Sequence, residues 1–283
     1  MSDPSQNAIT GQVRAFYEQM PFNYDATAED ASRRVAENPI GSYPDLDALL
    51  SEDGTARVLE IGCGAGWATN AIALNYNRHV TAVDMTQKAL DRAMEVSRLI
   101  GTADRITYVH SDLFAFRSEN LFDLVISIGV LHHTYDCRKA FDHVCGLVDK
   151  DGFLFIGLYH LAGRRVFLKM FQEILDHEGE EAAFQRFAAL NQPSRDETHL
   201  RSWFRDQVLH PNETQHSLEE VMGWLDENAF TLVSTSINGY DDVYDREALI
   251  DGEAAYEALS EQRNRHENSF FPGFFTVLAK RAG

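Results

Sequence analysis

The chain has 283 residues, and 44% of them are hydrophobic, which is enough to bury a substantial core in one large or two small domains. Asp and Glu number 44 against 25 Lys and Arg, so the formal net charge is −19. Nucleic-acid binders gain most of their affinity from cations that face phosphates, so this balance argues against a nucleic-acid partner and favours a small-molecule one.

The sequence contains no pattern that indicates a targeting signal or a disulfide. No apolar run is long enough to span a bilayer, and residues 1–12 lack the basic-then-apolar order of a secretory signal. Cys63, Cys137 and Cys145 are an odd number of cysteines without a C-x-x-C pair. We therefore expect a cytoplasmic protein that has no membrane partner, no disulfide framework and no cysteine zinc site.

The first part of the chain is predicted to be helical. Apolar side chains recur at helical spacing up to Met20, and Pro21 ends that helix. Thr27 and Asp30 have the pattern of a capping box at the start of a second helix. We assign residues 1–52 to a helical segment, or lid, that precedes the main domain.

Strands and helices then alternate, which indicates a parallel sheet covered by helices on both faces. The elements predicted here are strand 57–62, helix 66–76, strand 79–84, helix 87–99, strand 105–111, strand 122–128, helix 137–147 and strand 152–159.

The regular alternation stops after this region. Residues 160–215 contain no clear strand, but they carry apolar side chains at helical spacing, so we predict a helical insertion. Alternation resumes with helix 217–227 and strand 231–237, and the final strand is predicted within 270–280. The expected core is therefore 53–159 together with 216–283.

The stretch VLEIGCGAGWAT, residues 58–69, is the most informative part of the sequence. A short apolar strand leads into Gly62, Gly64 and Gly66, and a helical pattern begins at Trp67. A strand that turns through glycines into a helix leaves room for a nucleotide-like ligand beside backbone N–H groups.

The next strand ends in Asp84, 18 residues after Gly66, where a carboxylate can accept hydrogen bonds from both ribose hydroxyls. A dinucleotide fold requires a glycine at the position that Trp67 occupies. The pattern is instead E-x-G-x-G-x-G, which begins at Glu60.

These residues resemble the first motif of the class I S-adenosylmethionine (SAM) dependent methyltransferases. The resemblance continues through ITYVHSDL (106–113), FDLVISIGVLHHT (122–134) and LVDKDGFLFIGLYH (147–160). It implies a doubly wound α/β fold with a mostly parallel seven-stranded sheet whose last strand is antiparallel. The Asn/Asp-Pro-Pro-Tyr sequence of amino-directed nucleic-acid methyltransferases is replaced after the fourth strand by Ile128-Gly129-Val130-Leu131.

The resemblance also implies roles for individual residues in binding SAM and its product S-adenosylhomocysteine. Asp84 would accept from the ribose, Met85 would lie against the adenine, and Asp112 would accept from the adenine amino group. Met85 as a core residue and Asp112 as a helix cap are the alternatives. The full set of cofactor-binding residues is Glu60, Gly62, Gly64, Gly66, Asp84, Met85, Ser111, Asp112, Leu113, Ile128 and Gly129.

Polar side chains follow the fourth and fifth strands, at the edge where such sheets bind ligands. We predict His133, Tyr159 and His160 as candidate catalytic groups, because histidine can take a proton from the acceptor near neutral pH. One of the histidines has the alternative role of orienting the loop. Adjacent histidines seldom share one ion, so we expect no metal site.

Residues that select the methyl acceptor are expected over the ends of the strands. The candidates lie in the N-terminal aromatic segment and in the insertion. The alternative for the N-terminal aromatic residues is a role in the core. A stretch at 205–217 contributes candidates too, with a solvated loop as its alternative. The predicted substrate-binding residues are Tyr17, Phe22, Tyr24, His132, Phe167, Met170 and His210.

The expected function is SAM-dependent methylation of an oxygen or nitrogen on a small-molecule metabolite. The alternatives are a SAM-binding enzyme with another chemistry and a catalytically silent SAM-binding partner protein. If the insertion does not cover the site, it becomes a candidate surface for a homodimer.

Overall fold

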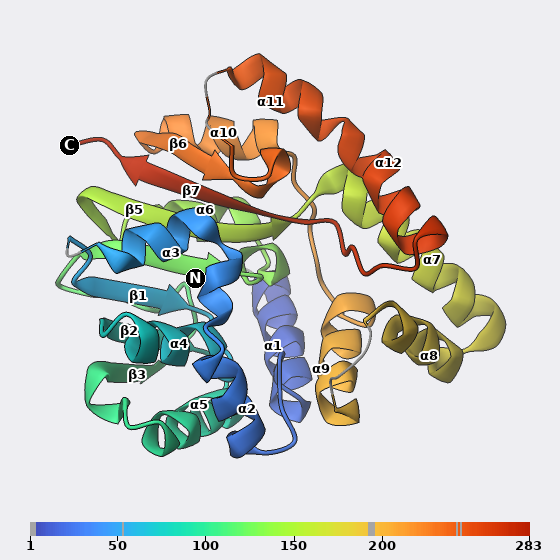
Figure 1. The fold of residues 1–283 in the computed structure, drawn as a ribbon, viewed down its shortest axis with the longest axis horizontal. Helices are drawn as coiled ribbons and strands as arrows, with labels where there is room; N and C mark the ends of the chain where they lie inside the picture. The colour runs from blue at the N-terminus through green and yellow to red at the C-terminus, as the bar shows by residue number, and fades with distance from the viewer. Residues whose placement is uncertain (1–3, 53, 192–195, 242, 244) are drawn as a thin grey trace.

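The computed structural model describes residues 4–52, 54–191, 196–241, 243 and 245–283. At its centre is a seven-stranded sheet with the order β3-β2-β1-β4-β5-β7-β6 (Figure 1). The strands are β1 (Arg57–Ile61), β2 (His79–Asp84), β3 (Ile106–His110), β4 (Phe122–Ile128), β5 (Val148–Tyr159), β6 (Phe230–Thr235) and β7 (Phe274–Arg281).

Strands β1 to β5 pair in parallel, whereas β7 lies antiparallel between β5 and β6. This confirms the predicted fold class, including the antiparallel last strand. The central strands β1 and β4 are buried on both faces, as their near-continuous apolar runs indicate. All five therefore end at the same edge of the sheet.

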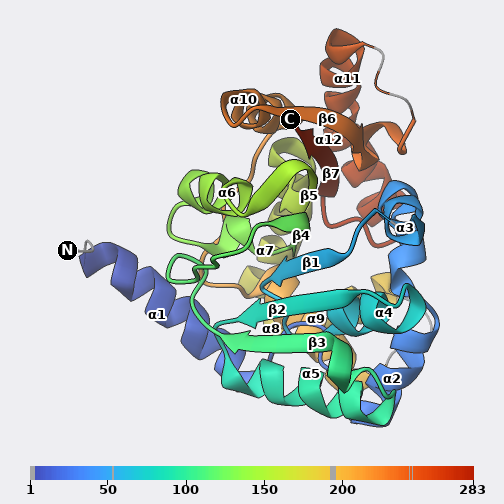
Figure 2. The ribbon, with the colours of Figure 1, turned by 90° about the vertical axis from the view of Figure 1, so that its left-hand side faces the viewer.

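Helices cover both faces of the sheet (Figure 2). Apolar side chains of α2, α3 and α4 pack on one face, and those of α6, α10 and α11 pack on the other. The bounds of the helices around the sheet are α2 (Ala28–Ala36), α3 (Pro44–Ser51), α4 (Trp67–Asn75), α5 (Gln87–Leu99), α6 (Cys137–Cys145), α10 (Leu218–Glu227), α11 (Arg246–Glu253) and α12 (Ala255–Glu261).

Capping side chains begin two of these helices where the sequence predicts them. The backbone N–H of Asp30 donates to Thr27 Oγ1 at 3.1 Å, and that of Glu220 donates to Ser217 Oγ at 3.0 Å. Each cap satisfies one N–H that the first helical turn leaves without a partner.

The segment between β5 and α10 is helical, as predicted. It forms α7 (Leu161–Glu178), α8 (Glu180–Leu190) and α9 (Glu197–Val208), and their apolar side chains make a separate core cluster. The N-terminal helix α1 (Pro4–Gln19) lies beside α9, beyond the carboxyl ends of β1 and β4 (Figure 1).

Two strand boundaries differ from the sequence prediction. Strand β5 begins at Val148, before the Asp-Gly pair that looks like a turn, because the strand continues through an irregularity in which Asp151 has φ 59°. Strand β7 begins only at Phe274, because Gly273 has φ 66° and bends the chain before the sheet. No helix in the described residues is long and apolar enough to cross a membrane.

Candidate active site

The glycine turn after β1 holds all three glycines in backbone conformations that favour glycine. The φ angles of Gly62, Gly64 and Gly66 are 74°, 53° and 81°. A side chain at Gly62 would collide with Val130, and one at Gly66 would collide with Ala93. Gly64 differs, because no heavy atom lies within 4 Å of where its Cβ would be. The turn is therefore packed at both ends and open in the middle.

The carboxylate of Asp84 is fixed beside this turn. One oxygen accepts from the backbone N–H of Gly64 at 2.9 Å, and the other accepts from the N–H and hydroxyl of Thr86, each at 2.8 Å. Burial raises the pKa of Asp84, and these hydrogen bonds oppose that rise. A carboxylate has about four acceptor positions, and three are used here, so about one remains for a ligand hydroxyl.

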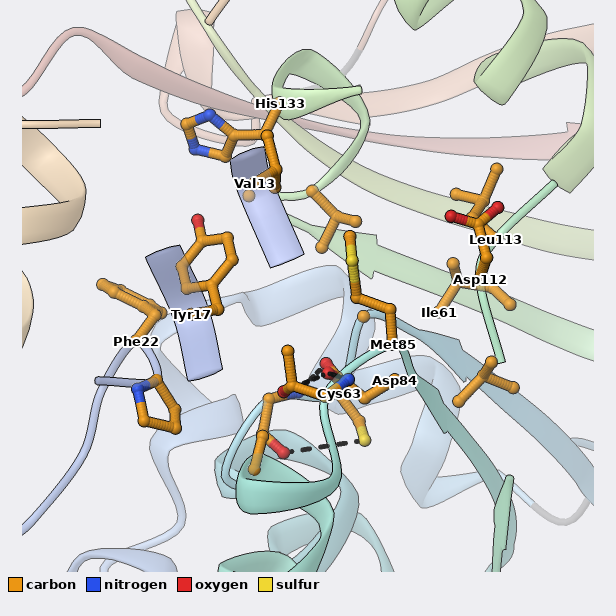
Figure 3. A pocket seen from close by; sticks show the side chains of 18 of the residues that line it. Val13, Tyr17, Phe22, Ile61, Cys63, Asp84, Met85, Asp112, Leu113 and His133 are labelled. Atoms are coloured by element: carbon orange, nitrogen blue, oxygen red, sulfur yellow. Dashed lines mark hydrogen bonds between the residues drawn. The ribbon is translucent and has the colours of Figure 1, made fainter. Parts of the chain in front are cut away.

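A cavity extends from the open side of the turn. Figure 3 shows Tyr17 and Phe22 on one side of it and Asp112 on the other. Its lining includes Val13, Tyr17, Phe22, Gly62, Cys63, Gly64, Asp84, Met85, Ser111, Asp112, Leu113, Ile128, Gly129 and His133. Nine of the eleven predicted cofactor residues are among them.

Glu60 and Gly66 are the two predicted cofactor residues that do not line this cavity. Glu60 is buried within β1 and accepts a short hydrogen bond from the hydroxyl of Thr69 at the start of α4. Burial raises the pKa of Glu60 to about 7. Protein atoms fill the space around both residues. Glu60 and Gly66 therefore hold β1, the glycine turn and α4 together on the side away from the cavity.

Asp112 combines a structural contact with a lining position. Its Oδ1 accepts from the backbone N–H of Phe114 at 2.8 Å, which holds the turn after β3. Its carboxylate also lines the cavity, as does Met85 at the end of β2. The capping alternative for Asp112 is therefore compatible with contact to a ligand.

A second cavity of about 330 Å³ adjoins the first. Phe22, Trp67, Ile128 and Gly129 line both, so they form the boundary between the two spaces. The second cavity, which we call the acceptor chamber, is lined by aromatic, aliphatic and polar residues and by a few ionisable side chains. Its aromatic residues are Phe22, Tyr43, Trp67, Tyr159, Trp203, Phe270 and Phe274.

His133 is the one histidine in the lining of the first cavity. Its Nδ1 lies 2.9 Å from the carbonyl oxygen of Asn212, so Nδ1 carries the proton and donates. Its Nε2 is buried without a hydrogen-bond partner. Burial lowers the pKa of His133 to about 4, so the ring is neutral at pH 7 and its Nε2 is an acceptor.

The other predicted histidines lie behind this position. His210 stacks on the His133 ring with 3.7 Å between centroids, and His132 lies between His133 and Tyr159. Neither lines the two cavities. Burial lowers the pKa of His132 and lowers that of His210 to about 3, so this stack is neutral. Ligand contact by His132 and His210 stays a prediction, and the structure places both rings against His133.

His160 is directed away from both cavities. It caps α7 by accepting from the backbone N–H of Gly163 at 3.1 Å, and its Nε2 lies 2.8 Å from the carboxylate of Glu253. Both ring nitrogens are therefore engaged in joining α7 to α11. Tyr159, one residue earlier and also predicted as a catalytic group, lines the second cavity, because neighbouring side chains on a strand face opposite sides.

Phe167, Met170 and Tyr24 also lie outside the two cavity linings. Phe167 and Met170 are buried in the cluster formed by α7, α8 and α9. Tyr24 holds the N-terminal segment to the domain, since its hydroxyl meets Arg92 at 3.1 Å and its backbone N–H donates to Ser202. Direct substrate contact by these three residues stays a prediction, and the contacts present in the structure are internal ones.

Sequence reasoning missed the polar residue at the centre of this site. Asp206 of α9 lines the acceptor chamber, and its carboxylate accepts from the hydroxyl of Tyr17 at 2.6 Å. The hydroxyl of Tyr159 lies 3.5 Å from the same carboxylate. The only available signal was its place in the stretch 205–217, since its partners are remote in the chain.

No group of three or more His, Cys, Asp or Glu side chains in the described part of the chain is arranged to hold a metal ion. The His132 and His133 rings meet edge to face, and the His133 and His210 rings are tilted by 33°.

Comparison with known proteins relates the chain to methyltransferases. Residues 59–156 match the family described as a methyltransferase domain. An uncharacterised methyltransferase from Mycobacterium tuberculosis is 35% identical over 41% of this chain and 61% of that protein. An uncharacterised protein from Synechococcus is 26% identical over 81% of this chain and 61% of its own length. The chain thus spans about three fifths of these curated relatives.

A solved structure extends the comparison to the fold. PKMT2 from Rickettsia typhi, crystallised in complex with AdoHcy, has a TM-score of 0.56 at 17% identity, over 80% of this chain and 48% of that one. Residues 59–156 therefore carry a methyltransferase domain, and the fold of the chain is similar to that of this solved methyltransferase structure. The cofactor of this family is SAM, and the product formed from it is S-adenosylhomocysteine.

The first cavity fits this methyltransferase cofactor by its own geometry. Gly64 leaves open space where a side chain would stand, and Asp84 presents a fixed carboxylate next to it. Asp112 and Met85 continue the lining toward β3. We refer to this space below as the cofactor cavity.

Proposed function

We propose that this methyltransferase transfers the methyl group of SAM to an oxygen or nitrogen of a small-molecule metabolite. The observation that carries the proposal is the acceptor chamber, which adjoins the cofactor cavity across Phe22, Trp67, Ile128 and Gly129. Its volume of about 330 Å³ lies at the small end of the range for ligand pockets. A chamber of this size suits a metabolite better than a folded macromolecule.

The cofactor, when bound, supplies a methyl group on a positively charged sulfur. The chain's own residues bind the cofactor, hold an acceptor in line with it and exclude water. Gly64, Asp84 and Asp112 are the groups proposed to hold the cofactor. Ile128 and Gly129 stand where the two cavities meet, so the reacting atoms are proposed to lie next to them.

The acid–base roles follow from the unpartnered atoms of each side chain and from its pKa. His133 lines the cofactor cavity and has a buried, unprotonated Nε2 without a hydrogen-bond partner, but its low pKa makes it a hydrogen-bond acceptor and a poor store for a proton. Tyr159 lines the acceptor chamber, and burial raises the pKa of its hydroxyl. We therefore propose that His133 and Tyr159 orient the acceptor.

The segment 160–215 and the N-terminal segment are proposed to act together as a cap over the strand ends. The part of the cap that meets the ligand is α9 with Tyr17 and Phe22, whereas α7 and α8 support α9 through their own apolar cluster. A sheet that binds SAM does not by itself choose an acceptor, so this cap would supply the choice.

Calorimetry with SAM, S-adenosylhomocysteine and NAD tests the cofactor. We expect binding of the first two and none of NAD, and the reverse would overturn the assignment. Methyl transfer is then tested with isotope-labelled SAM and panels of small amines and hydroxyl compounds. S-adenosylhomocysteine must accumulate one-for-one with a labelled product. SAM consumption without a labelled product would favour another SAM chemistry, and binding without consumption would favour a silent partner.

A further inference from the structure

The acceptor chamber contains one carboxylate that no cation neutralises. Asp206 is 5% exposed, and its partners are the hydroxyls of Tyr17 and Tyr159 and the side-chain amide of Gln207. All three are neutral donors, and no ion pair of Asp206 occurs among the described residues. A buried carboxylate without a paired cation is costly, so this arrangement calls for a positive partner.

The other charges near the chamber are already paired. The carboxylate of Asp25 meets Arg34 in a short contact and lies 3.1 Å from Nδ1 of His199. Arg92 donates to the carbonyl of Asp25 and pairs with Glu95. A ligand that enters the chamber therefore meets a negative charge at Asp206 and balanced charge elsewhere.

A strong cation also lies behind the chamber wall, but it is compensated. The guanidinium of Arg164 stacks on the Tyr159 ring, 3.6 Å from its centroid, and forms two hydrogen bonds to the carboxylate of Glu213. It reaches the amide oxygen of Gln207 as well, and Gln207 in turn donates to Asp206. Arg164 thus orients the amide that holds Asp206 and leaves the charge of Asp206 open to the chamber.

Two contacts of Asp206 place it near the end of the chamber that adjoins the cofactor cavity. Its hydrogen-bond partner Tyr17 lines the cofactor cavity, and Tyr159 follows the part of β5 that pairs with the end of β4. Along α9, His199, Trp203 and Asp206 share one face, so the Asp25–His199 pair stands roughly 10 Å from Asp206. Trp203 lies between these two positions on the same face of α9, and aromatic ring faces attract cations.

From this arrangement we infer that the methyl acceptor is an amine carried on an apolar, ring-sized body, and that Asp206 binds its nitrogen. The inference rests on the proposed function and narrows it from oxygen or nitrogen to nitrogen. An alkoxide or phenolate placed at the same point would be repelled by the carboxylate, whereas an ammonium is attracted both by it and by the ring faces.

The proton balance of the reaction fits the same residue. The bound ammonium first passes one proton to the carboxylate of Asp206, which frees the lone pair on nitrogen. That lone pair forms the new N–C bond, and the donor's S–C bond breaks with its electron pair left on sulfur. The methylated product leaves as an ammonium, and Asp206 then releases its proton to solvent. Burial raises the pKa of Asp206, which is the direction that a proton acceptor requires.

The test measures binding of three probes of matched shape in the presence of S-adenosylhomocysteine: 2-phenylethylamine, 2-phenylethanol and 3-phenylpropionate. Calorimetry should show the cation binding at least about tenfold more tightly than either of the others, which is the low end for a charged hydrogen bond. In the wild-type protein, equal binding of the alcohol and the amine, or tighter binding of the acid, would by itself overturn the inference.

Variants then test whether the preference for the amine probe depends on Asp206. Asp206→Asn should abolish this preference and leave the affinity for S-adenosylhomocysteine unchanged. Asp206→Glu should retain part of the preference. The matched control is Glu197→Gln, the same charge change on the same helix at a residue paired with Arg201 outside the chamber. Loss of the preference in Glu197→Gln, or its persistence in Asp206→Asn, would overturn the assignment. Failure of S-adenosylhomocysteine to bind the wild type would instead overturn the proposed function.

Discussion

Asp84 joins the glycine turn to the end of β2 through a single carboxylate. Its contacts with Gly64 and Thr86 fix the direction of the carboxylate before any ligand arrives. Such preorganisation lowers the cost of binding, because the side chain loses no further freedom.

Removing this carboxylate should weaken cofactor binding. We expect Asp84→Ala to lose about 1.5–3 kcal/mol of binding free energy for S-adenosylhomocysteine, the range for hydrogen bonds to a charged group. Calorimetry measures the effect. Asp149→Ala is the control, since Asp149 pairs with Arg57 at the opposite end of the sheet. Unchanged affinity in Asp84→Ala would show that the ribose is held elsewhere.

Gly64 is the point where the turn is open. A side chain there is strained by roughly 1–2 kcal/mol because φ is positive, and it projects into space proposed for the cofactor. We expect Gly64→Val to fold, as judged by circular dichroism, and to lose cofactor binding in calorimetry. Gly54→Val has equally open surroundings without a positive φ and should bind normally. A folded Gly64→Val protein of normal affinity would exclude this turn from the site.

The buried neutral state of His133 predicts a dependence of stability on pH. Its pKa is about 4 in the fold against 6.5 for the exposed group, so the unfolded chain binds more protons between these values. Stability is therefore present above pH 6.5 and declines as the pH falls toward 4, by on the order of 1–3 kcal/mol. His210 acts in the same direction.

Urea unfolding at pH 7.5 and pH 5 checks this. His133→Gln should lose less stability between the two values than the wild type, because glutamine does not titrate. His79→Gln, a change at an exposed histidine, should behave as the wild type does. The idea fails if all three proteins lose the same amount.

At the scale of elements, α1 and α9 form one side of the site. Besides the Tyr17–Asp206 contact, Arg205 donates to Gln19 and lies over the Phe16 ring. Few contacts join α1 to the sheet itself, so its position depends on α9 and α5. Such lightly held elements are the ones that open locally.

Ligand binding should therefore slow hydrogen exchange in residues 10–25 and in α9. Both segments line the cavities, so a ligand adds contacts that local opening would break. Exchange measured with and without S-adenosylhomocysteine tests this, with α11 as an internal reference that should not change. Equal protection in both states would rule out a mobile lid and leave the insertion as a candidate dimerisation surface.

At the scale of the whole molecule, the net charge of −19 opposes any polyanion. We expect binding to a DNA or RNA duplex to be weaker than about 10⁻⁴ M at physiological salt, below ordinary non-specific binders. Fluorescence anisotropy with labelled duplexes at two salt concentrations measures it. A micromolar affinity that falls steeply with salt would reveal a basic face and contradict a small-molecule acceptor.

The sequence by itself determined the sheet, the glycine turn and Asp84. These features are local: a strand, a tight turn and a helix follow one another within a dozen residues, and each has its own residue pattern. The same holds for the caps at Thr27 and Ser217. Alternation of strands and helices then leaves few topologies open, which is why the fold class was predictable.

Only the tertiary structure decided which side chains face the acceptor. Tyr17 and Asp206 are 189 positions apart, and no local pattern links them. Phe167 and Met170 have the spacing of a helix face, but that face packs on α8 and α9 and not on the ligand space. Periodicity shows that a face is buried, whereas the partner that buries it depends on how three helices pack together.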